Sequence, residues 1–331
     1  MTPRRMLTLV SLVLGTSILL IPAAAASSGG VEAALAWLRG AQLADGGFSS
    51  GFSDGSDIGA TADAVVAIAS AGETPDLWRT GEASPIDFLR AHAAEITAPG
   101  LAAKVALALT AAGEDPASFG EVDLTAVIAG GFNSSTGFYG GGPYDSALAI
   151  LALSQATGGV PPGAIEGLLR ARQPDGSYAF DGVMTPGSGD SNTTALAVQA
   201  LLIAGSGEET LHQKPSLFGE ATDSNSTALV IQALLAGGQD LGQWGNPEAS
   251  LLSLQQPSGA LAFNEDTPGD NALATLQAIP ALAGVDLTDL SRLAESAQAP
   301  SSAATAVLLG AGFLLVVVLV LSAIVGKPER S

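Results

Sequence analysis

Two stretches of this chain nearly repeat each other, and this repetition constrains the fold more than any other feature of the sequence. Residues 190–202 read DSNTTALAVQALL, and residues 223–235 read DSNSTALVIQALL. Each begins with a helix-capping Asp and is followed by a glycine that can end a helix, Gly205 or Gly237. Looser copies of the same pattern start near residues 57, 99, 143 and 269. Six copies, mostly about 40 to 47 residues apart, predict an array of helical hairpins.

More amphipathic segments alternate with these six apolar helices. They span residues 31–42, 85–95, 122–128, 162–173 and 247–256, and the segment before the fifth apolar helix is reduced to 208–219. Prolines near the first turn of three of them favour helix starts. We therefore expect an outer and an inner helix in each repeat. Nearly uniform inner helices favour a closed ring over an open array with polar ends, which predicts one all-α (α/α)6 toroid over residues 27–296.

The two ends of the chain carry apolar segments of different kinds. Residues 1–26 have a basic start, an apolar run and a small-residue region, which is typical of a cleaved secretory signal; an uncleaved anchor is the alternative. Residues 303–325 are uncharged and long enough to span a bilayer, and Lys327 and Arg330 follow them. We therefore expect a spacer at 297–302, one transmembrane helix at 303–325 and a cytoplasmic tail at 326–331. The N-terminal domain is then outside the cell, held at the cell membrane.

The charge balance of residues 27–301 excludes several partners. This part carries 8 of the 12 basic and 31 of the 32 acidic residues of the chain. Such a surface repels nucleic acid and anionic lipid. The chain also has no cysteine, which excludes thiolate catalysis and thiolate metal ligands. The exported domain must therefore be stabilised by burial of its core.

A second motif recurs in the loops that join the outer to the inner helices. It reads QLADGGF at 42–48, QPDGSY at 173–178 and QPSGAL at 256–261, and a weaker copy, STGFY, occupies 135–139. The Asp-Gly turn ends a helix, and the aromatic residue after it covers the adjoining helix ends. The motif therefore supports the hairpin interpretation of each repeat.

Together with the capped, Thr-Ala-rich helices, this motif resembles the α/α-toroid superfamily. The superfamily includes squalene and terpene cyclases, protein prenyltransferase β subunits, complement-type thioester domains and the cobalamin carriers transcobalamin and intrinsic factor. Residues 111–116, AAGEDP, with VDL at 122–124, are also similar to exported bacterial prenyltransferase/squalene-oxidase-repeat proteins. The resemblance covers about residues 31 to 290 and implies the toroid fold, whereas a fold alone does not imply an activity.

The residues that enzymes of this superfamily need are missing. The prenyltransferases use a zinc site of Asp, Cys and His, but the only histidines here are His92 and His212, expected on an outer helix and in a loop. The Asp-x-Asp-Asp motif of cyclases that protonate an alkene does not occur, nor does the Asp-Asp-x-x-Asp motif of those that ionise a diphosphate. Thioester chemistry needs a cysteine. The sequence thus favours a non-enzymatic protein with no metal site and no required cofactor.

Acidic residues leave one enzymatic alternative open. Two carboxylates suffice for glycoside hydrolysis, with Asp145, Asp190 and Asp223 as candidates. However, these acids, like Asp57 and Asp270, stand where apolar helices begin, and a carboxylate there caps the first free N–H groups. The capping interpretation is the simpler one.

A binding site at the mouth of the toroid requires no catalytic group. A closed toroid gathers the inner-helix N-termini and the loops before them at one rim. The residues predicted to line this mouth and the lumen below it are Phe48, Asp57, Tyr139, Tyr144, Asp145, Tyr178, Asp190, Asn192, Gln199, Asp223, Asn225, Gln232, Asp270 and Asn271.

Three polar residues stand inside otherwise apolar inner helices. Gln199 and Gln232 occupy the same position in two repeats, two turns below Asn192 and Asn225, and each amide needs a partner. Contacts between helices and contacts to a ligand are equally good explanations. Lys104 is the one base in an inner helix, and a salt bridge to a rim acid is favoured over binding of an anion.

The leading hypothesis from these residues is a membrane-anchored, extracellular module that binds a small organic ligand at the loop-lined mouth. A cobalamin, held by neutral hydrogen bonds and apolar contact, and a terpenoid are the candidate ligands. The alternatives are a degenerate cyclase-like or glycan-active enzyme and a protein-binding surface scaffold. The three hypotheses differ in what the lumen must contain. A ligand-binding module needs a pocket, an enzyme needs a pair of catalytic carboxylates, and a scaffold needs neither.

Overall fold

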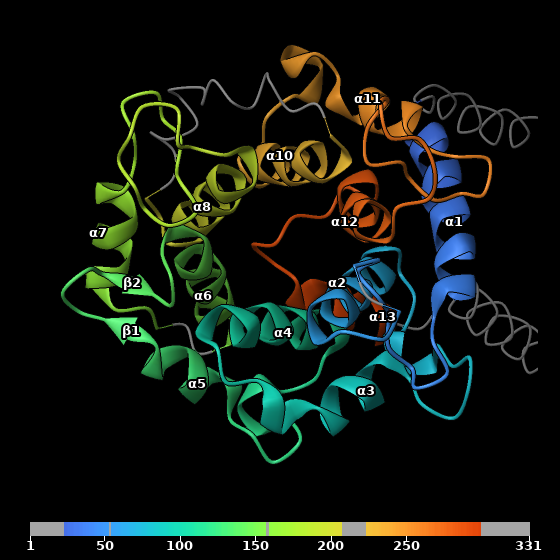
Figure 1. The fold of residues 1–331 in the computed structure, drawn as a ribbon, viewed down its shortest axis with the longest axis horizontal. Helices are drawn as coiled ribbons and strands as arrows, with labels where there is room; N and C mark the ends of the chain where they lie inside the picture. Colours follow the sequence, from blue (N-terminus) through green and yellow to red (C-terminus); the bar gives the residue numbers. More distant parts are fainter. Residues whose placement is uncertain (1–22, 53, 157–158, 207–222, 299–331) are drawn as a thin grey trace, which may run out of the picture.

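The computed structural model describes residues 23–52, 54–156, 159–206 and 223–298. Six helices form an inner ring, which further helices and loops surround (Figure 1). The inner helices are α2 (Ile58–Ser70), α4 (Pro99–Ala112), α6 (Pro143–Ala156), α8 (Ser191–Ile203), α10 (Ser224–Ala236) and α12 (Ala272–Leu282). Each packs against the next, and α12 packs against α2. The predicted toroid fold is therefore confirmed, and its inner ring is closed.

The outer layer consists of shorter elements. Its helices are α1 (Ala23–Ala41), α3 (Pro85–Ala91), α5 (Leu124–Gly130), α7 (Pro162–Arg170) and α11 (Pro247–Ser253). Single 3₁₀ turns occupy Pro75–Leu77, Ala93–Glu95, Pro116–Ser118 and Leu241–Trp244, and the antiparallel strands β1 (Phe132–Asn133) and β2 (Phe138–Tyr139) form a small hairpin. The predicted outer segment 208–219 lies outside the described residues.

Polar side chains at the N-termini explain where most inner helices begin. The carboxylates of Asp57, Asp190 and Asp223 accept the N–H of the third residue of α2, α8 and α10, at 2.6 to 2.8 Å. The prediction that Asp270 caps α12 is wrong, because Asn271 is the cap and Asp270 instead accepts hydrogen bonds from Trp37 and Ser258. These caps satisfy backbone donors that the helices themselves cannot.

In four of the repeats, a hydroxyl one turn into the inner helix attaches the preceding loop to that helix. Thr61 Oγ1 donates to the carbonyl of Asp57 at 2.8 Å and accepts the backbone N–H of Phe48 at 3.0 Å. The same pair of bonds recurs at Ser146 with Tyr139, at Thr194 with Tyr178 and at Thr275 with Leu261. These four repeats therefore bury the residue that stands two positions after the glycine of the turn, in the loops that carry the predicted motif.

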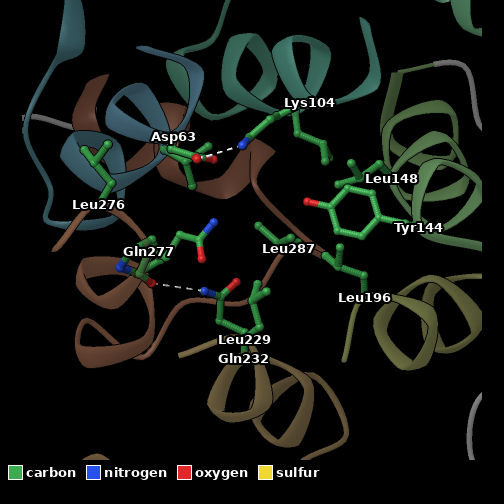
Figure 2. A pocket seen from close by; sticks show the side chains of 13 residues that line it. Asp63, Lys104, Tyr144, Leu148, Leu196, Leu229, Gln232, Leu276, Gln277 and Leu287 are labelled. Carbon is green, nitrogen blue, oxygen red and sulfur yellow. Dashed lines mark hydrogen bonds and ion pairs between the residues drawn. The ribbon is translucent and has the colours of Figure 1, made fainter. Parts of the chain in front are cut away.

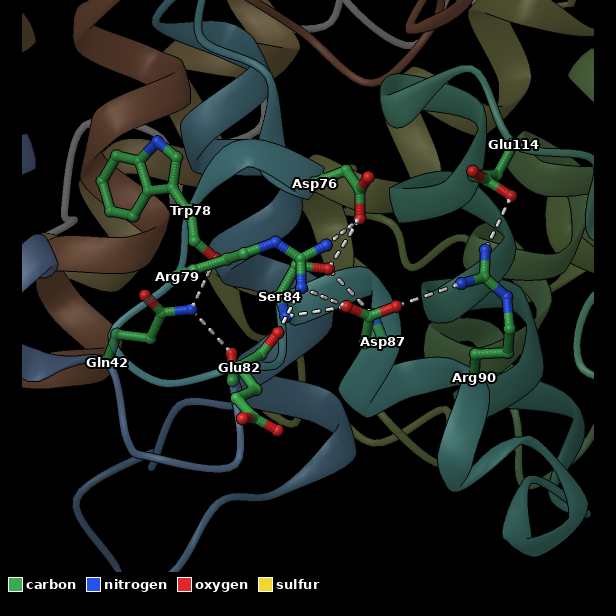
Figure 3. Close-up of polar contacts among 10 residues, drawn as sticks. Gln42, Asp76, Trp78, Arg79, Glu82, Ser84, Asp87, Arg90 and Glu114 are labelled. Carbon is green, nitrogen blue, oxygen red and sulfur yellow. Dashed lines mark hydrogen bonds and ion pairs between the residues drawn. The ribbon is translucent and has the colours of Figure 1, made fainter.

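The outer helix α3 shows how the outer layer is held together (Figure 3). Ser84 and Asp87 form a reciprocal capping box, with Ser84 Oγ accepting from the Asp87 N–H at 3.1 Å and Asp87 Oδ2 accepting from the Ser84 N–H at 3.0 Å. Arg79 binds the same carboxylate at 2.8 Å. From the neighbouring loop, Gln42 donates to the carbonyls of Gly46 and Trp78 at 3.0 Å. Side-chain contacts of this kind fix a seven-residue helix that is too short to be stable alone.

The segment after α12 forms a floor under the ring. Residues 283–290 leave the end of α12 and cross to α13 (Ser291–Gln298), which packs against α4 and α2 (Figure 1). Gln199 Oε1 accepts the N–H of Leu287 at 2.9 Å. Gln155 donates to the carbonyl of Leu287 at 2.9 Å and accepts the N–H of Leu290 at 2.8 Å. Two inner-helix glutamines thus bind the floor segment to the ring.

The predicted membrane segments cannot be compared with this structure. Across the parts of the chain that it describes, the helices are all too short or too polar to cross a bilayer. The predicted transmembrane segment 303–325, the tail 326–331 and residues 1–22 of the predicted signal lie outside these parts. Helix α1 begins at Ala23, within the small-residue region of that signal.

Candidate ligand-binding site

A cavity with a volume of about 60 Å³ occupies the lumen of the ring. All six inner helices contribute to its wall, and Leu287 of the floor segment closes its lower end. The lining residues are Asp63, Val66, Lys104, Leu107, Tyr144, Leu148, Leu196, Leu229, Gln232, Leu276, Gln277, Pro280 and Leu287 (Figure 2).

One position of the repeat determines the character of this wall. This position lies six residues after the residue that precedes each inner helix, and it faces the cavity in every repeat. It is occupied by Asp63, Lys104, Leu148, Leu196, Leu229 and Gln277. The polar three belong to α12, α2 and α4, which are consecutive around the ring, and the leucines belong to α6, α8 and α10. The lumen therefore has a polar half and an apolar half.

An ion pair lies at the centre of the polar half. Lys104 Nζ contacts Asp63 Oδ2 at 2.7 Å. Their side chains keep 24% and 15% of their exposure, so solvent reaches the pair through the cavity. Burial raises the pKa of Asp63, and the Lys104 ammonium opposes this rise. For Lys104, burial is the largest effect and lowers the pKa, but Asp63, Tyr144 and Asp57 together outweigh it and leave the pKa above its ordinary value.

Side-chain amides of α12 and α10 extend the polar half from this pair to the border of the apolar half. Gln277 hydrogen-bonds Asp63, and its Oε1 accepts a hydrogen bond from Asn225 Nδ2 at 3.1 Å. Gln232 Nε2 donates to the backbone carbonyl of Gln277 at 3.5 Å. Figure 2 shows the side chains of Gln277 and Gln232 next to each other, on the side of the cavity opposite Leu148 and Tyr144.

The apolar half is formed by leucines and by Tyr144. Its hydroxyl points into the cavity (Figure 2), and burial raises its pKa. The ring of Phe180, on the loop before α8, lies 5.1 Å from the Tyr144 ring, so it covers Tyr144 from the mouth side. Aromatic contact at this distance and the leucines beside it make this wall suited to hydrocarbon.

A second depression, with a volume of about 250 Å³, lies at the mouth itself. It is bounded by the N-termini of α8, α10 and α12 and by two exposed rings, Phe52 and Phe263. Four predicted mouth residues line it: Asn192, Asp223, Asn225 and Asn271. Asn225, which lines this depression, hydrogen-bonds Gln277, which lines the lumen cavity, so the two hollows are adjacent.

The other predicted site residues lie elsewhere. Tyr144 and Gln232 line the lumen, whereas Asp57, Asp190 and Asp270 are engaged in the caps and loop contacts given above. Gln199 is covered by the floor segment, and Asp145 accepts the N–H of Gly141 at 2.8 Å. The rings of Phe48, Tyr139 and Tyr178 are fully buried between the inner and outer layers and line neither hollow.

The predicted salt bridge of Lys104 is present, but its partner was missed. We expected an acid at the rim, and the structure gives Asp63, in the middle of α2. Gln277 was missed as well. A signal for both exists in the sequence, because each occupies the same repeat position as Lys104, six residues after the cap. Aligning the repeats on their caps would have brought these three residues together.

Metal chemistry finds little support in this wall. Within the described residues, no three His, Asp or Glu side chains lie together as metal ligands do. His92 stacks on Phe88, with ring centroids 4.5 Å apart, and contacts Glu95 in the outer layer, whereas His212 lies outside these residues. The chemistry of the site is therefore that of one ion pair, several amides and a hydrocarbon wall.

Comparison with known proteins bears on the fold. No protein-family profile and no curated protein match the chain. A variant of the type II terpene cyclase MstE from Scytonema, solved with its substrate geranylgeranyl dihydroxybenzoate, matches with a TM-score of 0.59 at 13% identity, covering 83% of this chain and 100% of that one. The same enzyme without ligand matches with a TM-score of 0.56 at 14% identity, over 79% and 98% of the two chains. A protein from Actinoplanes matches with a TM-score of 0.56 at 15% identity, over 78% and 99%. At such identities the similarity is one of architecture, and the chain thus has the α/α-toroid fold of type II terpene cyclases.

Proposed function

We propose that this protein binds a small, largely apolar organic molecule in the lumen of the toroid and does not transform it. The observation that carries the proposal is the division of the cavity wall into a leucine-rich half and a half with one ion pair and two amides. Apolar walls with a few placed polar groups are the usual composition of small-molecule sites. The complex of MstE with a geranylgeranyl compound supports an isoprenoid as the class of ligand.

The ion pair argues against cyclase chemistry. Protonation of an alkene requires a strong acid, and Asp63 is the only carboxylate that lines the cavity among the described residues. Burial raises the pKa of this carboxylate, but Lys104, at 2.7 Å, opposes the rise and holds the carboxylate in an ion pair. A paired carboxylate is a poorer proton donor than the strong acid that alkene protonation requires. Glycoside hydrolysis would need a second carboxylate across the cavity, where the described wall has leucines and Tyr144.

The test is unfolding of the full chain in detergent against a ligand panel of farnesol, geranylgeraniol, cobalamin and a short glycan. Binding of a ligand at 100 times its Kd should stabilise the fold by about 2.7 kcal/mol. We expect saturable stabilisation by the isoprenoids. A Leu196→Trp variant, which fills the apolar half, should abolish it and provides the control. Stabilisation by none of the panel, or by an isoprenoid equally in the variant, would contradict binding in the lumen.

The mouth depression supports cobalamin as a second candidate ligand. A corrinoid is edged with amides, and Asn192, Asn225 and Asn271 are neutral partners for such groups beside two exposed rings. This alternative makes a different prediction, because cobalamin at the mouth should be insensitive to Leu196→Trp and weakened by Asn192→Leu. The variant that abolishes binding therefore identifies the site.

We further propose that the toroid is held on the outer side of the cell membrane by residues 303–325. Their apolar length and the basic residues after them support this arrangement. Fractionation of cells tests it, together with digestion of intact cells by an external protease. The full chain should be found in the membrane fraction and be cleaved from outside, and a chain ending at residue 302 should be released. A full chain in the soluble fraction would contradict the anchor.

A further inference from the structure

One atom of the lumen has no hydrogen-bond partner among the described residues, and it is the side-chain oxygen of Gln232. The side chain is 2% exposed. Its orientation is set by Nε2, which donates to the carbonyl of Gln277. Exchanging the two amide atoms would place two oxygens against each other, so Oε1 is the atom that faces away from Gln277. Figure 2 shows it turned towards the interior of the cavity.

Nothing in the described wall around Gln232 satisfies this oxygen. Buried amide oxygens are nearly always hydrogen-bonded, because an unmade bond costs the full desolvation of the group. The nearest lining residues of the apolar half offer only hydrocarbon. The ammonium of Lys104 is engaged by Asp63, and the hydroxyl of Tyr144 belongs to the opposite wall (Figure 2). The cavity therefore presents an acceptor that lacks a donor.

We propose that the ligand is a neutral alcohol whose hydroxyl donates to Gln232 Oε1, while its hydrocarbon skeleton lies on Leu148, Leu196 and Leu229. This inference rests on the proposed function and specifies the ligand class. An ammonium would also donate, but it would meet the fixed positive charge of Lys104. A diphosphate has no donor for Gln232 and would face the carboxylate of Asp63. A neutral hydroxyl has neither conflict.

The test compares three probes that share one skeleton, farnesol, farnesyl methyl ether and farnesene, by calorimetric titration of the full chain. The ether keeps the oxygen and removes the donor, and farnesene removes both. We expect farnesol to bind about tenfold more tightly than the ether. In a Gln232→Leu variant the three affinities should converge. Gln239→Leu makes the same exchange just beyond the end of the same helix and outside the cavity, so it is the control and should keep the preference.

The possible failures are distinguishable. Equal binding of the three probes to the unaltered protein would overturn the alcohol inference and leave lumen binding intact. Binding of none of them would overturn the proposed function itself. A preference for farnesol that survives in Gln232→Leu would overturn the assignment of the acceptor. Gln232→Leu removes an unsatisfied group, so we expect it to fold and to unfold no earlier than the unaltered protein.

Discussion

Single residues at one repeat position give the lumen its chemistry, and the Lys104–Asp63 pair has the largest energetic consequence. Lys104→Met removes the ammonium and leaves the Asp63 carboxylate inside the ring without its partner. We expect a loss of about 2–4 kcal/mol in the free energy of unfolding, measured by urea denaturation. Because solvent reaches the pair, the lower end of this range is the better expectation.

The double variant Lys104→Met/Asp63→Leu separates pairing from burial. It removes both charges and should be within about 1 kcal/mol of the unaltered protein, or above it. A single Lys104→Met variant that is as stable as the unaltered protein would show that Asp63 is not ionised in the fold.

The capping box of α3 makes stability depend on pH. The N–H of Ser84 is the main cause that lowers the pKa of Asp87 below its ordinary 3.8, and Arg79 adds to it. A lowered pKa means that the carboxylate contributes stability above pH 3.8, and this contribution is lost as the pH falls through the pKa of the folded state. Asp87→Asn should therefore be less stable than the unaltered protein at pH 6. The difference should be at most about 1 kcal/mol, because Asp87 is exposed to solvent.

Urea denaturation of both proteins between pH 6 and pH 2 measures this contribution. We expect the two stabilities to converge as the pH falls below 3.8 and through the pKa of Asp87 in the folded state. A difference that stays constant over the whole range would show that the charge of Asp87 contributes nothing to the cap.

At the scale of elements, the floor segment depends chiefly on Gln155 among the two glutamines that bind it. Gln155 makes two of the bonds that attach residues 283–290 to the ring. Gln155→Leu leaves the carbonyl of Leu287 and the N–H of Leu290 without these partners, which should cost about 2–3 kcal/mol. The local signature is faster hydrogen exchange at the Leu290 amide. Gln239→Leu is the control. It loses only a hydrogen bond to the carbonyl of Gly237, two residues away, and should leave the exchange rate of the Leu290 amide unchanged.

The elements show what could be predicted from the sequence. Caps at Asp57, Asp190 and Asp223 set the inner helices to within a residue or two, since the capping bond is local. The exchange of Asp270 for Asn271 as the cap of α12 could not be foreseen, because it depends on Trp37, which is distant in the sequence. Caps formed by neighbouring residues could be predicted from the sequence, whereas contacts between different repeats could not.

The candidate site was predicted in outline only. The sequence indicated a mouth with Asn192, Asp223, Asn225 and Asn271, and these residues do come together. The two repeated glutamines were assigned alike, yet Gln232 faces the cavity and Gln199 is covered by Leu287. That difference arises from the floor segment, which belongs to no repeat and left no periodic signal.

At the scale of the whole molecule, closure of the ring depends on a glycine of the last loop motif. Gly259 has a φ of +98°, and a Cβ placed on it would lie 2.1 Å from the carbonyl oxygen of Ala33 in α1. Gly259→Ala should therefore force the last loop away from the first helix, at about 2–4 kcal/mol. Gly72→Ala is the matched control. It has a φ of +79° and open space around it, so it should lose only about 1–2 kcal/mol of backbone strain.

Thermal unfolding of the two variants measures this difference. Equal losses for Gly259→Ala and Gly72→Ala would show that the contact with α1 does not contribute to stability.

The closed ring also dictates the order of events when the chain folds. The contact between α2 and α12 joins segments about two hundred residues apart, so it can form only after nearly all of the domain has been synthesised. Until then, the apolar faces of α2 and α10 have no neighbour on that side. Loop closure over such a span is slow, and apolar surface that stays uncovered during it favours aggregation. The seam between the first and last repeats is therefore where we expect a nascent chain to be most dependent on chaperones.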